Sequence, residues 1–118
     1  MNDHRTYQLL IEVGEPMDID VGRLGCCHFA AGRYIYTGSA KRNFEARIAR
    51  HLRKDKKLHW HIDYLLTQPG VIVVDVRRYG DEECDINHRQ LGAIPLPGFG
   101  ASDCRERCGS HLKYLGPI

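Results

Sequence analysis

The fold is decided by the stretch Gly32-Arg33-Tyr34-Ile35-Tyr36-Thr37-Gly38-Ser39-Ala40. Its aromatic and β-branched residues favour a strand, and the Gly38-Ser39 pair near its end predicts a tight turn. Because side chains alternate across a strand, Tyr34, Tyr36 and Gly38 are expected on one face. The stretch therefore predicts a strand that presents two tyrosines to a single layer and then turns into the next element.

A basic amphipathic helix is predicted for residues 43–54, directly after this strand. Its apolar residues recur at helical spacing and define one face: Phe44, Ile48 and Leu52. Arg47 and His51 are one turn apart on the flank of that face, so they should lean toward the surface on which the helix packs. If that surface is the tyrosine strand, then tyrosines, an arginine and a histidine meet at one half-buried place. Such a place is suited to phosphate chemistry.

The remaining patterns predict an α+β fold. Thr6 to Val13 alternates as a strand does, and the β-branched run Val71 to Val76 suits a strand that is buried on both faces. Residues 14–31 look like a hairpin inserted between two main strands, and His59 to Leu66 like a short helix. A further helix is expected to open at Asp81, with a charged first turn. We therefore expect a small central β-sheet flanked by helices, followed by an irregular C-terminal extension.

Size and composition predict a single domain over residues 1–118. No apolar run is long enough to span a bilayer, and the N-terminus carries no signal-peptide pattern, so a cytoplasmic location without membrane contact is expected. The five cysteines are then expected to be thiols or metal ligands rather than disulfides. A structural zinc ion on Cys104, Cys108 and His111 is disfavoured, because the spacing is uncommon and a fourth ligand would have to come from far away.

Positive charge is concentrated between residues 41 and 57, where Glu45 and Asp55 are the only acidic residues. A polyanion such as DNA can dock on a run of this kind, and RNA fits it equally well. The alternative is a solvated helix face with no partner. The predicted nucleic-acid contacts are Lys41, Arg42, Arg50, Lys54, His59 and His61.

Four motifs follow one another along the chain: Tyr34-Ile35-Tyr36-Thr37-Gly38-Ser39-Ala40, Arg47-Ile48-Ala49-Arg50-His51, His59-Trp60-His61-Ile62-Asp63-Tyr64-Leu65-Leu66 and Phe99-Gly100-Ala101-Ser102-Asp103-Cys104. Their order resembles that of the GIY-YIG nuclease superfamily, and most closely its small single-domain Uri-like branch. The resemblance covers nearly the whole chain. It implies a GIY-YIG-like fold and a metal-dependent endonuclease that cleaves DNA, in repair or in structure-selective cleavage.

The resemblance also implies roles for particular residues. Tyr7 and Tyr36 match the tyrosines of the two motifs, Gly38 matches the glycine, Arg47 the catalytic arginine, His51 the histidine one turn on, and Glu83 the metal-binding glutamate. The chain also departs from the family pattern. The first motif reads Thr6-Tyr7 and lacks its Gly-Ile, Thr37 replaces the middle isoleucine of the second motif, and residues 14–31 lengthen the gap between the two motifs.

Phosphodiester hydrolysis needs an activated water and a partner for the phosphate charge. Mg²⁺ or Mn²⁺ on Glu83 could polarise the phosphate, and the planar fork of Arg47 could pair with it. The base could be Tyr7 or Tyr36, although a free phenol has a pKa near 10, or His51 could act as base or relay. These three alternatives stay open at this stage. Each of these residues also has an ordinary structural explanation, Glu83 as a helix first-turn charge above all.

Three functions follow from these patterns. The first is a divalent-metal-dependent endonuclease, for which a lone domain of this size is compatible with a targeting protein partner. The second is a non-catalytic nucleic-acid-binding module that keeps the nuclease fold, which the altered first motif supports. The third is a partner-binding domain that uses the Gly- and Pro-rich tail. The oligomeric state is left open by the sequence.

Overall fold

The structure is a computed structural model that describes residues 5–40, 42–58, 60–80, 86–87, 90, 92 and 110–117. Its elements in chain order are β1 (Thr6–Val13), β2 (Met17–Asp20), a 3-10 turn (Gly22–Leu24), β3 (Cys26–Phe29), β4 (Gly32–Ser39), α1 (Phe44–Leu52), α2 (His61–Leu66), β5 (Val71–Tyr79) and β6 (Leu112–Gly116). The predicted α+β class is confirmed.

The main sheet has four strands in the order β5-β1-β4-β6, and all of these pairings are antiparallel. The strands predicted around Tyr7 and Tyr36 are its two central members. Their register places Tyr7 opposite Gly38 and Leu9 opposite Tyr36. Because directly opposed residues point to the same face, the side chains of Tyr7, Leu9 and Tyr36 share one side of the sheet, with Gly38 opposite Tyr7.

The prediction that Val71 to Val76 is buried on both faces is wrong. β5 lies at the edge of the sheet, where β1 is its strand neighbour, and Ile72 and Val74 are 54% and 44% exposed. A β-branched run favours a strand through its fit to a pleated surface, but it does not determine whether that strand lies at the centre or at the edge.

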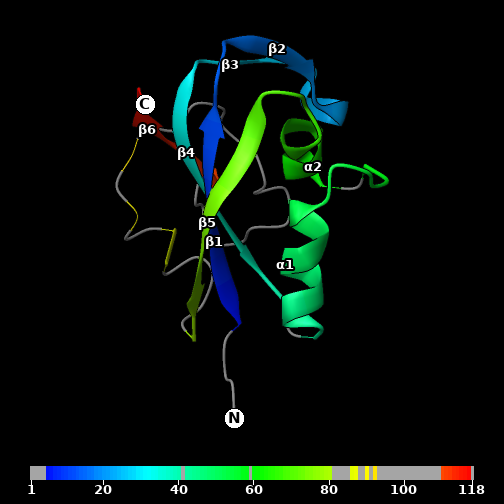
Figure 1. Ribbon diagram of the computed structural model, residues 1–118, viewed down its shortest axis with the longest axis vertical. Helices are drawn as coiled ribbons and strands as arrows, with labels where there is room; N and C mark the ends of the chain where they lie inside the picture. Colours follow the sequence, from blue (N-terminus) through cyan, green and yellow to red (C-terminus); the bar gives the residue numbers. More distant parts are fainter. Residues whose placement is uncertain are drawn as a thin grey trace.

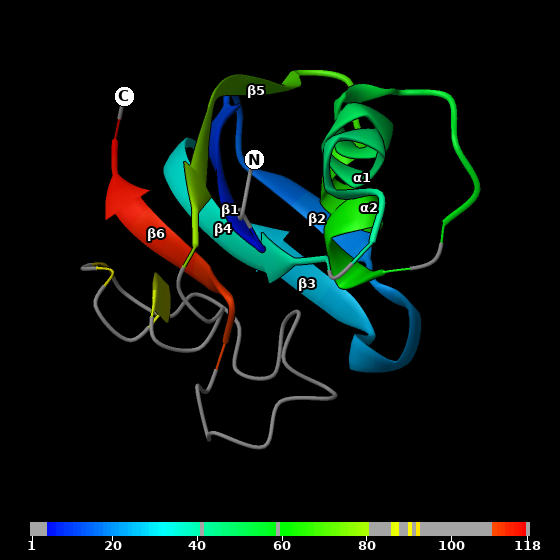
Figure 2. The ribbon, with the colours of Figure 1, turned by 90° about the horizontal axis from the view of Figure 1, so that it is seen from below.

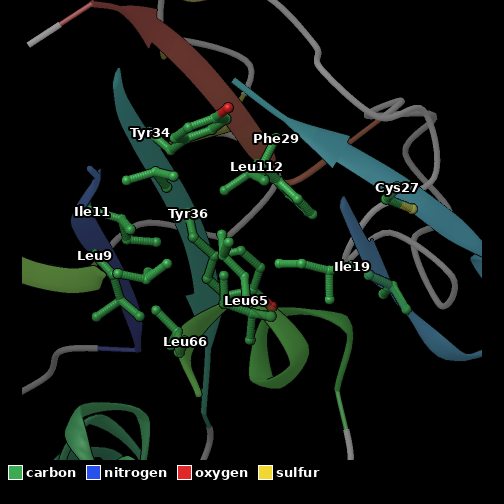
Figure 3. Packing of buried hydrophobic residues seen from close by; sticks show 14 of the residues in the cluster. Leu9, Ile11, Ile19, Cys27, Phe29, Tyr34, Tyr36, Leu65, Leu66 and Leu112 are labelled. Atoms are coloured by element: carbon green, nitrogen blue, oxygen red, sulfur yellow. The ribbon is translucent and has the colours of Figure 1, made fainter. Parts of the chain in front are cut away.

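Both helices lie on one side of the sheet (Figures 1 and 2). The core between these layers includes Leu9, Ile11 and Leu65 (Figure 3). The prediction that Leu52 faces inward is wrong, because its side chain is 52% exposed. Successive residues of an α-helix are rotated by about 100° around its axis. Leu52, eight residues after Phe44, therefore points about 80° away from it, whereas His51, seven residues after Phe44, points within about 20° of it. His51 therefore completes the buried stripe.

The predicted hairpin within residues 14–31 is confirmed, since β2 and β3 form a separate antiparallel pair. Its inner residues Ile19, Cys27 and Phe29 are buried and join the main core (Figure 3). The hairpin therefore extends the core on the side of the helices instead of standing away from the domain.

The predicted helix from Asp81 and the C-terminal extension lie mostly outside the described residues. Within the part that is described, Ile86 and Asn87 are buried, and the backbone N–H of Gln90 donates to the carbonyl of Ile86, as in a helical turn. Neither of the two helices bounded above has the length or the apolar character that crossing a membrane would require.

Candidate active site

The side chains of Tyr7 and His51 meet between the sheet and α1. The phenolic oxygen of Tyr7 lies 2.6 Å from Nε2 of His51, and each residue is only 2% exposed. Tyr7 comes from β1 and His51 from the last turn of α1, and the ring of Phe44 in the first turn packs edge-on against the Tyr7 ring at 5.8 Å. The buried stripe of α1 thus lies directly over Tyr7.

Gly38 provides the space that the Tyr7 phenol occupies. A Cβ atom on Gly38 would lie 2.5 Å from the Tyr7 hydroxyl oxygen, which is well inside van der Waals contact. The predicted tight turn at Gly38 and Ser39 is wrong, because both residues belong to β4. The glycine is required here by the approach of a ring from the neighbouring strand, and not by the backbone conformation of a turn.

His51 is neutral at pH 7. Its pKa is lowered to about 4, chiefly by burial and also by the nearby cations Lys56, Arg50 and Arg47, while Asp63 acts in the opposite direction. A neutral imidazole has one nitrogen that donates and one that accepts. Its Nδ1 atom is buried and has no hydrogen-bond partner in the part of the chain that the structure describes. Nε2 is therefore the nitrogen through which His51 acts on Tyr7.

Arg47 is half-buried beside this pair. One of its N–H groups donates to the carbonyl of Ser39 at 2.7 Å, and its guanidinium lies over the Trp60 ring at 4.9 Å. A guanidinium has five N–H donors, so groups remain that can bind a phosphate oxygen. The predicted meeting of tyrosine, arginine and histidine is present in the structure. Tyr36 belongs to the same group of side chains, because its ring packs edge-on against the His51 ring with the centroids 6.2 Å apart.

Two of the predicted nucleic-acid contacts have partners within the protein. Arg50 forms a two-pronged ion pair with Asp63, with both N–O distances at 3.0 Å. The ammonium of Lys54 donates to the carbonyls of Leu66, Gln68 and Val71. Since an ammonium has three donors, Lys54 is saturated by the backbone.

Asp63 joins the two helices. It is fully buried, and besides Arg50 it accepts a hydrogen bond from the backbone N–H of Trp60 at 2.9 Å. Lys56, whose pKa burial lowers to about 8, donates to the carbonyls of Arg50 and His51 at the end of α1. These contacts fix the end of α1 and therefore the position of the His51 ring.

The other predicted site residues fall into two groups. Arg42 is exposed just before α1, and His61 is half-buried, with its pKa lowered by burial. Outside the described residues lie Lys41, His59, Glu83, Cys104 and Cys108. Among the residues that are described, no group of three or more histidine, cysteine or carboxylate side chains could hold a metal ion.

The sequence reasoning missed two features of the site. The first is the structural role of Asp63, for which a signal existed: an acidic residue three positions after a helix start commonly binds the backbone there. The second is an ion pair between Glu45 and Arg78, which are 33 residues apart in the chain. No local pattern indicates this pair.

Residues 6–117 match the family described as "Domain of unknown function DUF123". The chain belongs to the DUF123 family. No curated protein and no solved structure matches it. The function of this DUF123 protein therefore has to be argued from its own site.

Proposed function

We propose that this DUF123 protein is an endonuclease that hydrolyses phosphodiester bonds in DNA, in repair or in structure-selective cleavage. The observation that carries the proposal is the 2.6 Å contact between the Tyr7 phenol and Nε2 of His51, beside the half-buried Arg47. A hydroxyl next to a neutral imidazole can move a proton, and a guanidinium can bind the phosphate. The resemblance to GIY-YIG nucleases supports the same reading.

Of the two candidate tyrosines, the geometry favours Tyr7 as the group that activates water. Its oxygen is in direct contact with His51, whereas Tyr36 meets His51 ring to ring, with the ring centroids 6.2 Å apart. As a water oxygen forms its bond to phosphorus, its proton passes to the Tyr7 oxygen and the Tyr7 proton passes to Nε2 of His51. The leaving oxygen departs with the electron pair of the broken P–O bond. A histidine whose pKa is about 4 holds the proton only transiently and can release it to that oxygen.

Arg47 has the role of pairing with the phosphoryl oxygens, where its effect is strengthened by the exclusion of water. A divalent cation such as Mg²⁺ or Mn²⁺ would add polarisation of the phosphate and stabilisation of the leaving oxygen. The described residues contain no group of three or more histidine, cysteine or carboxylate side chains that could hold it, and Glu83, its proposed ligand, lies outside them. The steps above therefore use only Tyr7, His51 and Arg47.

A cleavage assay tests this proposal. Labelled single-stranded, duplex, flap and branched DNA and one RNA are incubated with the protein in Mg²⁺, in Mn²⁺ and in EDTA. We expect metal-dependent cleavage that Arg47→Ala abolishes and that Arg53→Ala, at an exposed position at the end of the same helix, retains. Equal cutting by Arg47→Ala and the wild type would overturn the site assignment.

A second candidate function is a non-catalytic nucleic-acid-binding module. It is favoured by one observation: Tyr7 and His51 are each only 2% exposed, so little of the pair's surface is in contact with solvent. This function predicts binding that weakens steeply with salt, without cleavage in either metal.

A further inference from the structure

A two-pronged ion pair joins β5 to the first turn of α1. Nε of Arg78 donates to Glu45 Oε2 at 2.9 Å and to Oε1 at 3.2 Å, and Nη2 donates to Oε1 at 2.8 Å. The side chain of Arg78 is 36% exposed and that of Glu45 is 58% exposed. A guanidinium fork closed on two oxygens is also the geometry in which arginine binds phosphate.

The position of this pair relates it to Tyr7. Arg78 is the residue directly opposite Tyr7 in the β1–β5 ladder, so the two side chains point to the same face. Glu45 follows Phe44, whose ring packs on Tyr7. The start of β1, the end of β5 and the start of α1 lie at the same end of the molecule (Figure 1). The ion pair therefore borders the Tyr7 site.

Two guanidiniums lie on the two sides of Tyr7, one carried by β5 and the other by α1. Arg78 belongs to β5, on one side of β1. Arg47 donates a hydrogen bond to the carbonyl of Ser39 in β4, on the other side of β1. An extended chain of phosphates crossing this end of the sheet would meet both. A single phosphate group would not need the two.

We propose that Arg78 is a phosphate-binding residue of this site, and that Glu45 occupies its guanidinium until a backbone phosphate of a nucleic acid displaces the carboxylate. This inference rests on the proposed function and adds a self-inhibiting contact to it. An exposed ion pair is weak and is screened by salt, so exchange of one anion for another is feasible. Glu45 then also disfavours ligands that carry too little negative charge to compete with it.

The same strand supplies a matched control. Arg77 and Asp75 are a second exposed arginine–carboxylate pair on β5, at 3.8 Å, but Arg77 lies opposite Gln8 and so points to the other face of the sheet. Asp75→Asn removes one negative charge, as Glu45→Gln does, and it does so beside an arginine that is the sequence neighbour of Arg78. The comparison therefore separates the release of a guanidinium at the site from a general change in charge.

The experiment measures binding of a fluorescently labelled DNA oligonucleotide by anisotropy, in EDTA, over a series of salt concentrations. We expect Glu45→Gln to tighten binding about three- to tenfold and to steepen the slope of log affinity against log salt by about one, since one more phosphate is neutralised. Asp75→Asn should change the affinity by less than about twofold. Arg78→Gln should weaken binding, and adding Glu45→Gln to it should give no more gain than Asp75→Asn gives.

Two results would overturn the inference: a gain with Glu45→Gln no larger than with Asp75→Asn, or a gain that persists in the Arg78→Gln background. If the wild type binds and cleaves DNA while either result is found, the inference fails and the proposed function stands. If neither the wild type nor Glu45→Gln binds DNA or RNA, the proposed function fails and the inference fails with it. All four variants change exposed residues, and thermal unfolding checks that each is folded.

Discussion

The phenolic oxygen of Tyr7 and Nε2 of His51 lie 2.6 Å apart, although 44 residues separate them in the chain. A strand at the centre of the sheet supplies the phenol, and the last turn of α1 supplies the imidazole. The pair is held from both sides, by Phe44 against the Tyr7 ring and by Lys56 on the carbonyl of His51. The predictions below test this arrangement and the contacts that maintain it.

Gly38→Ala should displace Tyr7. The new Cβ would lie 2.5 Å from the Tyr7 oxygen, and the buried ring has little room to move, so we expect a loss of about 1–3 kcal/mol of stability from overpacking, together with loss of activity. Thermal and urea unfolding measure the first effect. The control is Gly14→Ala, whose Cβ would meet only a carbonyl at 3.5 Å; equal stability of the two variants would contradict the account.

Asp63→Ala should destabilise the protein by about 3–5 kcal/mol, because it leaves the partly buried Arg50 without its carboxylate. Asp63 is fully buried and Arg50 is 27% exposed at its side chain. Glu12→Ala, which breaks the exposed pair with Arg33, should cost less than about 1 kcal/mol. Urea unfolding of both variants makes the comparison, and similar losses in the two would show that Asp63 does not join the helices.

Acid should destabilise the protein through His51. The pKa of His51 is about 4 in the folded state against about 6.5 in the unfolded chain, so between these values the unfolded state binds the extra proton and stability falls as the pH falls. The contribution is about 2 kcal/mol lost at pH 5 relative to pH 7.5. Urea unfolding at the two pH values should show this loss in the wild type and a smaller loss in His51→Gln. The same loss in both would place the titration elsewhere.

Lys54→Met should lower stability and leave the salt dependence of nucleic-acid binding unchanged, because the Lys54 ammonium is bonded to three backbone carbonyls. Lys57→Met, at an exposed position, should leave stability unchanged. It should make the salt dependence of nucleic-acid binding shallower, because one phosphate contact of the basic run is lost. Paired unfolding and anisotropy measurements separate the two effects. A shallower salt slope in Lys54→Met with unchanged stability would restore Lys54 as a nucleic-acid contact.

The central part of the site could be predicted from the sequence because it depends on local periodicity. Alternation along β4 places Tyr34 and Tyr36 on one face, and helical spacing turns Arg47 and His51 toward the surface on which α1 packs. The same reasoning failed for Leu52, since an apolar residue at i+8 has already rotated away from the stripe.

Non-local features could not be predicted in this way. Whether the Val71 to Val76 run lies at the edge or the centre depends on strand order, which its β-branched composition does not encode. The Glu45–Arg78 pair depends on the register of β5 against β1 and on the position of α1 over both. The basic run predicts a nucleic-acid surface, whereas in the structure two of its members, Arg50 and Lys54, bind acceptors within the protein.

The most direct test of the central claim is the cleavage rate of Tyr7→Phe, which removes one oxygen atom and keeps the ring that packs on Phe44. Its control is Tyr34→Phe, which removes the hydroxyl of another buried tyrosine, bonded to the carbonyl of Ala30 away from the site. The account predicts that Tyr7→Phe remains folded and loses cleavage by about 100-fold or more, while Tyr34→Phe cleaves at a rate close to that of the wild type. Cleavage by Tyr7→Phe at the wild-type rate would contradict the claim that the Tyr7–His51 pair activates the attacking water.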